Sequence, residues 1–311
     1  MSKNIYKYVA PEHLDKVIGS SDQVTLKCSY PKAFNDPYEL FLTINFKEQP
    51  DALAFYADVV GEIPQLPTTC FSRSPVVIPM WAHYAQSQQG FAIEFNEAML
   101  AKSFPKSEFG DVDYRDTPNE DLTNMLYRAS VIGKPRYLYL LQKGVISAAY
   151  YTKATCWSYE HERRMIVRES ETRRTDDLIL MDVPRECVTA LLCGSHASPE
   201  TVHAIRAKAD QLGCKYFKLK IGRSSAVPFF VNLDNETFIF NGTDVEQTSQ
   251  ICASCKEPLA AESEQCSLCQ IDDCHKIAAA DRNVFRALAH HGMLEEYITG
   301  MNDISRGAHK T

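Results

Sequence analysis

The sequence predicts an α+β fold with a mixed, mostly antiparallel central sheet and flanking helices, followed by a small C-terminal zinc ribbon and a helical tail. Short apolar runs typical of strands recur along residues 1–245, and segments with helical spacing separate them. Two Cys-x2-Cys pairs after residue 250 indicate the ribbon. We therefore expect an α+β domain at 1–245, a zinc ribbon at 250–275 and a helical tail at 276–311.

The expected strands are short runs of apolar and β-branched residues between turn formers. They cover residues 5–9, 24–28, 68–72, 91–95, 112–114, 165–167, 187–193 and 216–221, with a hairpin at 229–240. The strands at 187–193 and 216–221 flank a helix that begins after Ser198, an N-cap followed by proline, and ends at Gly213. Together they predict one strand–helix–strand unit. Its glycines do not form a phosphate-binding pattern, so we assign it a structural role.

Helices are expected where apolar residues recur at the spacing of one helix face. These segments are 10–17, 50–60, 77–85 and 119–151, and the tail is expected to contain two more amphipathic helices at 284–291 and 293–298. Between 97 and 117 we expect a polar, irregular connection around the strand at 112–114.

The composition excludes some classes of protein. A net charge of -7 argues against a generally basic nucleic-acid-binding protein. No apolar run reaches the roughly 20 residues that span a bilayer, and residues 1–8 lack the apolar segment of a secretion signal. Of the 11 cysteines, five lie between Cys252 and Cys274, which favours one metal site in a reducing, cytoplasmic setting over a disulfide framework.

Residues 153–168 have the highest density of chemically active side chains. Glu160 and Glu162 are two residues apart, so in extended backbone they point to the same side. Two neighbouring carboxylates repel, so we expect one to have a raised pKa or a cationic partner such as Lys153 or Arg163. The alternative is a solvated run of charges at a strand edge; Trp157, within this stretch, favours a site.

Two earlier segments carry further candidate site residues. Asn35 and Asp36 precede a proline and either cap a turn or belong to a site with their neighbours Phe34 and Glu39. In the second segment, Trp81, His83 and Tyr84 lie on an expected helix. Trp81 and Tyr84 share one face and are either core residues or site residues, and His83 is more often a core histidine than a ligand.

The spacing Cys252-x2-Cys255, ten residues, then Cys266-x2-Cys269 is that of a zinc ribbon. Each pair offers two thiolates, and two pairs complete a tetrahedron, so we expect a structural zinc closed to substrate. Cys274 and His275 follow and are alternative ligands; four unligated thiols are the other possibility.

In combination, the blocks FNDPYE (34–39), MWAHY (80–84) and WSYEHER (157–163) resemble a bacterial domain-of-unknown-function family with FNDP(F/Y)E, MWxHY and WxxExER blocks. The resemblance covers about residues 5–225 and leaves the ribbon and tail outside. The layout is also similar to ADP-ribosyltransferase-type domains. These have a key residue on an early strand, a hydroxyl or tyrosine on a middle strand, and a Glu-x-Glu pair opening a late strand.

The second resemblance implies an NAD-consuming enzyme with the roles carried over residue by residue. Tyr6 to Tyr8 take the first position, Ser72 the second, and Glu160 and Glu162 the third, with Glu162 as the catalytic carboxylate. Glu160 would orient or deprotonate the acceptor. The other residues of the implied substrate site are Tyr6, Lys7, Phe34, Asn35, Asp36, Glu39, Trp81, His83, Tyr84, Lys153, Trp157 and Arg163. Many such transferases serve as toxins or in phage defence, so the resemblance also implies that use.

Two other classes of function stay open. A nucleic-acid processing enzyme, such as a nuclease, would use the clustered carboxylates with a divalent metal and grip its substrate with the ribbon. A non-catalytic interaction module would use the aromatic blocks as core. The expected partners are a nucleotide substrate, a nucleic-acid or protein acceptor, and a protein bound through the ribbon and tail.

Overall fold

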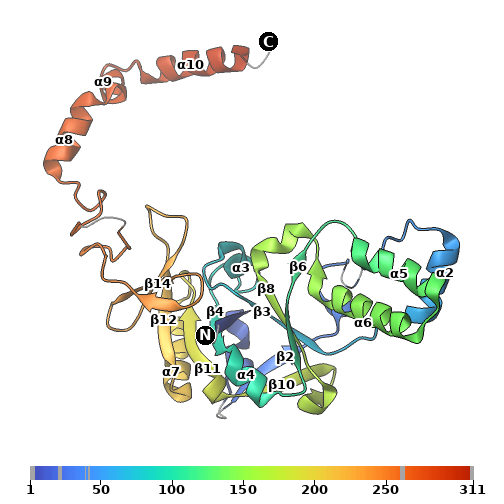
Figure 1. The fold of residues 1–311 in the computed structure, drawn as a ribbon. Coiled ribbons are helices and arrows are strands. Elements are labelled where there is room, and N and C mark those ends of the chain that lie inside the picture. Colours follow the sequence, from blue (N-terminus) through green and yellow to red (C-terminus); the bar gives the residue numbers. More distant parts are fainter. Residues whose placement is uncertain (1–3, 20–22, 39, 41–42, 260–262, 309–311) are drawn as a thin grey trace. The chain divides into compact units, whose positions relative to one another are not determined.

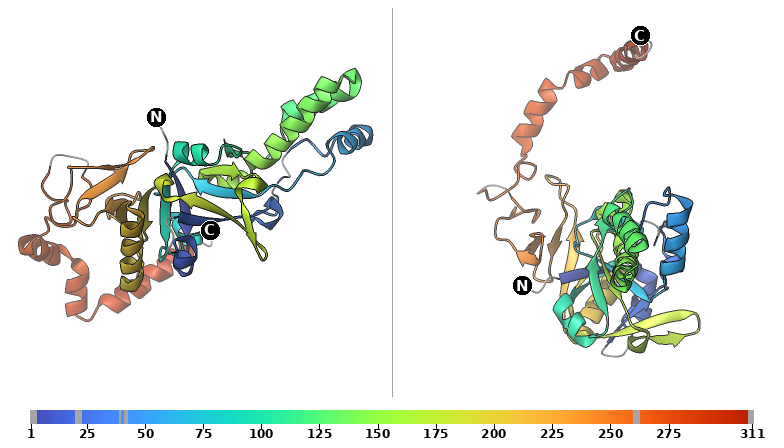
Figure 2. Two further views of the ribbon diagram at one scale, coloured as in Figure 1. Left: turned by 90° about the horizontal axis from the view of Figure 1, so that it is seen from below. Right: turned by 45° about the vertical axis from the view of Figure 1, so that its right-hand side comes forward.

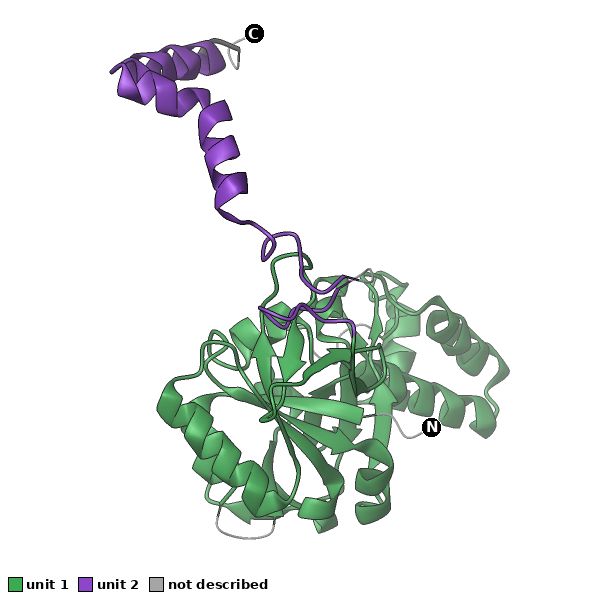
Figure 3. Ribbon diagram, turned by 90° about the vertical axis from the view of Figure 1, so that its left-hand side faces the viewer, with its two compact units in different colours: residues 1–249 green, residues 250–311 purple. Residues whose placement is uncertain are grey.

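The computed structural model describes residues 4–19, 23–38, 40, 43–259 and 263–308. The chain divides into two compact units, residues 1–249 and residues 250–311 (Figure 3). The first unit combines a curled, mostly antiparallel sheet with several helices, so the predicted fold class is confirmed (Figure 1).

The central sheet of the first unit has ten strands. In sheet order they are β15 (Val245–Gln247), β14 (Thr237–Phe240), β13 (Phe229–Val231), β12 (Lys215–Lys220), β11 (Val188–Cys193), β4 (Phe91–Asn96), β1 (Asn4–Val9), β3 (Thr68–Ser72), β8 (Glu162–Ile166) and β5 (Glu108–Asp111). Only β11 and β12 pair in parallel among these described strands, because α7 (Pro199–Leu212) carries the chain back between them. The Ser198 side chain accepts a hydrogen bond from the Thr201 amide at the start of α7, and Gly213 ends it in the left-handed region, as the sequence predicts.

The strands alternate their side chains between two apolar layers. Ile5 and Val9 of β1 pack into one core, whereas Tyr6 and Tyr8 pack into the other. β4 is buried from Phe91 to Phe95 because it lies near the middle of the sheet and is covered on both faces.

Two smaller sheets complete the strands of this unit. They are β2 (Gln23–Cys28), β10 (Leu178–Pro184) and β9 (Arg173–Thr175), and the parallel pair β6 (Asp113–Tyr114) and β7 (Thr152–Lys153). The whole of β2 pairs with β10, from Ile179 to Pro184. The sequence analysis predicts β2 but not β9 or β10.

The remaining described helices of the unit are α1 (Leu14–Val17), α2 (Pro50–Val60), α3 (Ile78–His83), α4 (Glu97–Ser103), α5 (Glu120–Ile132) and α6 (Pro135–Tyr151), with 3₁₀ turns η1 (Pro11–His13), η2 (Pro31–Ala33), η3 (Thr155–Glu160), η4 (Glu169–Glu171) and η5 (Arg185–Cys187). Of these helices, α4 lies in a segment that the sequence predicts to be irregular. Its N-cap Asn96 accepts a hydrogen bond from the Met99 amide.

α2, α5 and α6 form a separate helical layer that projects from the sheet (Figures 1 and 2). Residues 119–151 are expected as one helical section, but Gly133 ends α5 with φ 65° and Pro135 opens α6. Leu122, Leu126 and Leu141 are buried in this layer, as their spacing predicts.

The sheet opens between β1 and β3. β1 pairs with β4 over six residues, but in the described parts of both strands it pairs with β3 through Tyr6 and Ser72 alone. β3 instead pairs with β8 from Thr68 to Ser72. The two strands therefore meet at one point and then separate, leaving a gap in the middle of the sheet.

Gly90 lies where the turn after α3 enters β4, against the end of β1. A Cβ at this position would lie 2.1 Å from the carbonyl oxygen of Val9. Because backbone must move to relieve that contact, we expect Gly90→Ala to lower the free energy of unfolding by about 1–3 kcal/mol. Gly19→Ala is the matched control, since its Cβ would meet only an ordinary 3.7 Å contact with Asp15. Urea unfolding followed by circular dichroism compares the two, and equal stabilities would contradict the prediction.

The second unit contains the cysteine pairs and the helices α8 (Asp273–Arg282), α9 (Val284–His290) and α10 (Leu294–Ala308). The sequence analysis predicts the last two helices but not α8. None of the described helices of either unit combines the length and apolar character needed to cross a membrane.

Candidate functional site

A cavity of about 390 Å³ lies in the first unit where β1 and β3 separate. The strands, the chain after β2 and the η3–β8 connection all contribute to its wall. Ten of the residues singled out in the sequence line it. They are Tyr6, Lys7, Tyr8, Phe34, Asn35, Ser72, Tyr84, Lys153, Glu160 and Glu162. Segments far apart in the sequence thus converge on one pocket, within the volume range of small-molecule sites.

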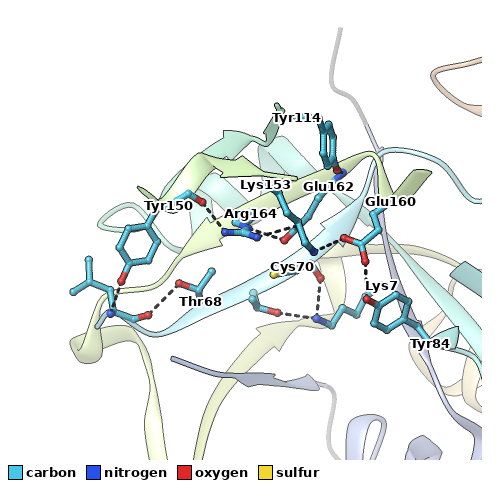
Figure 4. A network of polar contacts seen from close by, with 12 residues as sticks. Lys7, Thr68, Cys70, Tyr84, Tyr114, Tyr150, Lys153, Glu160, Glu162 and Arg164 are labelled. Carbon is cyan, nitrogen blue, oxygen red and sulfur yellow. Dashed lines mark hydrogen bonds and ion pairs between the residues drawn. The ribbon is translucent and has the colours of Figure 1, made fainter. Parts of the chain in front are cut away.

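The two glutamates share a buried lysine (Figure 4). The Lys153 ammonium lies 2.6 Å from Glu160 Oε2 and 3.3 Å from Glu162 Oε2, and all three side chains are buried. Burial alone would lower the pKa of Lys153, but Glu162 and Glu160 outweigh it and raise that pKa. The expectation of a cationic partner is therefore met by Lys153.

Arg164 is a second cation beside Glu162. Its Nε donates to Glu162 Oε1 at 2.7 Å, and its Nη1 donates to the Tyr150 carbonyl at 2.9 Å. Burial raises the pKa of Glu162, but Arg164 and Lys153 outweigh it and lower that pKa to about 2. Glu162 is thus ionised at neutral pH even though it is almost fully buried.

The backbone at the acid pair differs from the extended form expected. Glu160 ends η3, His161 has φ 45° in the left-handed region, and β8 begins at Glu162. The turn still delivers both carboxylates to Lys153.

Arg163 points away from the acid pair, because neighbouring residues of a strand face opposite sides. Its guanidinium binds Glu97, with Nη2 2.6 Å from Oε1. Arg163 is therefore neither the partner of Glu160 and Glu162 nor part of the cavity lining. Trp157 also lies outside the lining, with its ring 4.5 Å from the Lys153 ammonium.

Lys7 fills part of the gap between the separated strands. Its ammonium donates to the Cys70 carbonyl at 2.8 Å and to Thr69 Oγ1 at 3.1 Å, both on β3 (Figure 4). Lys27, an exposed residue of β2, lines the same cavity. Two further cations therefore face the cavity in addition to the buried Lys153.

Hydroxyl groups hold the turn that carries Glu160. Ser72 Oγ donates to the Glu160 carbonyl at 2.7 Å, and Tyr84 Oη donates to Glu160 Oε1 at 2.6 Å. Tyr8 Oη donates to the Ser74 carbonyl at 2.8 Å. Burial raises the pKa of Tyr8, and burial together with Glu160 raises that of Tyr84, so these phenols stay neutral.

Four other candidates lie outside the cavity lining or outside the described residues. Trp81 is a core residue, fully buried, with its indole nitrogen donating to the Pro75 carbonyl at 2.8 Å. His83 is exposed rather than a core histidine. Asp36 caps its turn by accepting from the Tyr38 amide at 2.9 Å. Glu39 lies outside the described residues.

Arg164, Lys27 and Tyr114 also lie at this site and are not among the candidates from the sequence. Tyr114 Oη accepts a hydrogen bond from the Glu162 amide at 2.8 Å. Arg164 had a signal, because a residue two positions after Glu162 in a strand shares its face. No pattern in the sequence points to Lys27 or Tyr114, because only the tertiary fold brings β2 and β6 to the site.

The segment from α3 to β8 therefore carries the MWAHY block, Lys153 and both glutamates. Residues 80–165 match one protein-family model. The matching family is described as "Protein of unknown function (DUF2971)", which agrees with the resemblance to a domain of unknown function over a shorter span than expected. Neither a curated protein nor a solved structure matches the chain.

The second unit contains the other candidate site. The Sγ atoms of Cys252, Cys255, Cys266 and Cys269 all lie within 4.8 Å of one another. Those of Cys255 and Cys266 are 3.8 Å apart, which is about the S–S edge of a tetrahedron with Zn–S bonds of roughly 2.3 Å. The four thiols therefore fit a metal ion such as zinc. His275 instead caps α8 with Asp272, and Cys274 lies outside the cluster.

Proposed function

We propose that the cavity binds NAD and that the chain transfers ADP-ribose from it, with Glu162 as the catalytic carboxylate. One observation carries the proposal. Tyr6 is directly opposite Ser72, and Ser72 is directly opposite Glu162, so the three form one row across β1, β3 and β8. An early-strand residue, a middle-strand hydroxyl and a late-strand glutamate are the pattern of the ADP-ribosyltransferase-type layout that the sequence resembles.

The charge state of Glu162 suits the reaction. When the bond between nicotinamide and ribose breaks, its electron pair leaves with nicotinamide and positive charge develops on the ribose, as in glycoside hydrolysis. An ionised carboxylate fixed beside the ribose stabilises that charge without having to reorganise. Glu162 is ionised and is held by Arg164 and Lys153.

The other lining groups suit the remaining parts of NAD. Lys7 and Lys27 supply positive charge for the pyrophosphate, and Phe34 and Tyr84 supply aromatic faces for the rings. Glu160 is held by Lys153 and Tyr84 at the same wall, where it would orient the acceptor.

The position of Lys153 favours the transferase over a metal-dependent nuclease. Its ammonium bridges Glu160 and Glu162, the place where a divalent ion shared by the two carboxylates would bind. In the part of the chain that the structure describes, the four cysteines are the one group of three or more potential ligands close enough to hold a metal.

The test is release of nicotinamide from NAD by the full chain, measured chromatographically. We expect Glu162→Gln to reduce the rate by about 100-fold or more, because it removes the charge that stabilises the transition state. Glu97→Gln is the matched control, since Glu97 pairs with Arg163 on the opposite face of β8. An unchanged rate in folded Glu162→Gln protein would remove Glu162 from the mechanism.

Lys27→Ala provides a second variant that does not disturb the buried network, because Lys27 is exposed. It should raise KM for NAD and leave kcat nearly unchanged, as loss of a ground-state contact predicts. An unaltered KM would contradict the assignment of the pyrophosphate to this side of the cavity.

A further inference from the structure

The end of the α5–α6 hairpin carries exposed apolar and basic side chains together. α6 has 17 residues and leads into β7, so its first turn lies about 25 Å along the helix from that strand. The turn that joins the two helices is therefore at the outer end of the layer that projects from the sheet (Figure 2). We call the five exposed residues around this turn the basic tip: Arg128, Val131, Ile132, Lys134 and Arg136. Val131 is 82% exposed and Ile132 is 45% exposed.

The charge of the basic tip is opposite to that of the whole chain. The net charge is -7, yet residues 122–159 contain no Asp or Glu. Within the described chain, none of the three cations of the tip has a carboxylate at ion-pair distance. They gather around Tyr137, whose pKa is lowered by the hydrogen bond and charge of Arg136 and by the charges of Lys134 and Arg128. The tip therefore offers unpaired positive charge to an anionic partner.

The same character continues along the outer face of α6. Tyr139, Leu140 and Lys143 follow Arg136 at spacings of three, four and seven residues, so they share one side of the helix. All three are exposed, with Tyr139 60% exposed, whereas Leu141 is buried in the layer. The hairpin thus presents a continuous apolar and basic side, and an exposed surface of this kind marks an interaction site.

The aliphatic side chains decide which anionic partner fits. A nucleic acid would use the cations through its phosphates but would gain little from burying Val131 and Ile132. A membrane with anionic lipids uses both kinds of side chain, because cations bind the headgroups while apolar groups enter the boundary with the acyl chains. Tyrosine, here Tyr139, is enriched at that depth. The tip also protrudes, and a lipid surface accepts a protruding shape without a preformed pocket.

We propose that the basic tip docks on the surface of a membrane that contains anionic lipids. Val131 and Ile132 enter between the headgroups, and the three cations of the tip bind the anionic groups of those headgroups. The chain then lies on the membrane rather than across it. None of the five residues lines the cavity, so this docking is independent of the reaction proposed there.

The experiment measures co-sedimentation of the full, metal-loaded chain with lipid vesicles. We expect binding to mixed phosphatidylcholine and phosphatidylserine vesicles, weaker binding at higher salt, and little binding to phosphatidylcholine alone. A cation at an anionic surface contributes about fivefold to affinity, so the triple variant Arg128→Ala, Lys134→Ala, Arg136→Ala should bind about 100-fold more weakly.

A second triple variant is the matched control for charge. Lys16→Ala, Lys102→Ala and Lys220→Ala make the same change in net charge at exposed positions elsewhere in the first unit. This variant should bind the mixed vesicles nearly as the parent does. An equal loss of binding in the two triple variants would show that overall charge, and not the basic tip, attracts the vesicles.

Val131→Ser tests the aliphatic contribution. It should weaken binding to the mixed vesicles by about tenfold, because an apolar side chain no longer leaves water. Val227→Ser is the matched control, since Val227 is also exposed but lies outside the basic tip. Both valines are open to solvent in the free chain, so neither change should disturb the fold.

Three results would overturn the proposal. They are no binding to the mixed vesicles, unchanged binding in the triple variant of the tip, and unchanged binding in Val131→Ser. Fluorescence anisotropy with a short DNA or RNA oligonucleotide tests the other anionic partner. Binding of the oligonucleotide that falls in the triple variant of the tip but not in Val131→Ser, without binding to vesicles, would assign the tip to nucleic acid instead.

Discussion

If the four cysteines hold zinc, as we expect, a chelator should unfold the cysteine-containing segment and leave the first unit folded. The described part of the segment has little apolar core, with Cys252 its one buried cysteine, so we expect its stability to depend on metal binding. Apparent binding energies of structural zinc are about 10–16 kcal/mol. Limited proteolysis should therefore cut between 250 and 272 after chelation and spare the first unit.

Two single-residue variants test this prediction without a chelator. Cys252→Ser should reproduce the effect of the chelator without any chelator present. Cys274→Ser should behave like the parent, because Cys274 is exposed and outside the cluster. Absence of bound metal in the purified chain, or an unchanged cleavage pattern after chelation, would contradict the account.

Replacing Arg164 with Met is expected to destabilise the first unit strongly. Arg164 is fully buried, and its removal leaves the buried Glu162 carboxylate with one cation, Lys153, in place of two. Breaking a buried ion pair in this way costs about 3–5 kcal/mol. Arg163→Met is the matched control, because the neighbouring arginine pairs with Glu97 on the other face and its loss should cost much less. If both variants lost the same free energy of unfolding, the buried pair would contribute no more than the Arg163–Glu97 pair.

The same network predicts how stability depends on pH. The pKa of Glu162 is about 2 in the folded chain, below its ordinary value of 4.5, so between these values the unfolded state binds more protons. The contribution of Glu162 to stability is present above about pH 4.5 and is lost as the pH falls towards 2. In Arg164→Met the pKa of Glu162 should be lowered less, because Lys153 alone then opposes the effect of burial. The stability lost on acidification should therefore be smaller. Urea unfolding between pH 3 and pH 7 measures the difference. If the free energy of unfolding changed with pH equally in the two proteins, the prediction would be wrong.

Local patterns in the sequence predict much of the fold. The short run at 91–95, the Ser198 and Gly213 signals around α7 and the paired cysteines each depend on neighbours in the chain. α4 spans only seven residues and β10 begins with the uniformly apolar run LILM, so neither has a clear period in the sequence, and their positions depend on packing against distant strands. β10, for example, is fixed by pairing with β2.

The candidate site is predictable in its residues but less so in their contacts. Lys153 is one of the two cations anticipated as a partner of Glu160 and Glu162, and the structure pairs it with both carboxylates. Arg163 and Arg164 are adjacent arginines of one strand, but their side chains lie on opposite faces. Arg163 binds Glu97, and Arg164 binds Glu162. The separation of β1 from β3, which creates the cavity, is a property of the whole sheet and has no signal in either strand alone.

We propose above that NAD binds where β1 and β3 separate. The most direct measurement is a crystal structure of the Glu162→Gln chain soaked with NAD. We expect NAD in the cavity, with a ribose hydroxyl at hydrogen-bond distance from residue 162 and the pyrophosphate beside Lys7 or Lys27. An empty cavity at saturating NAD, or NAD bound away from residue 162, would contradict it.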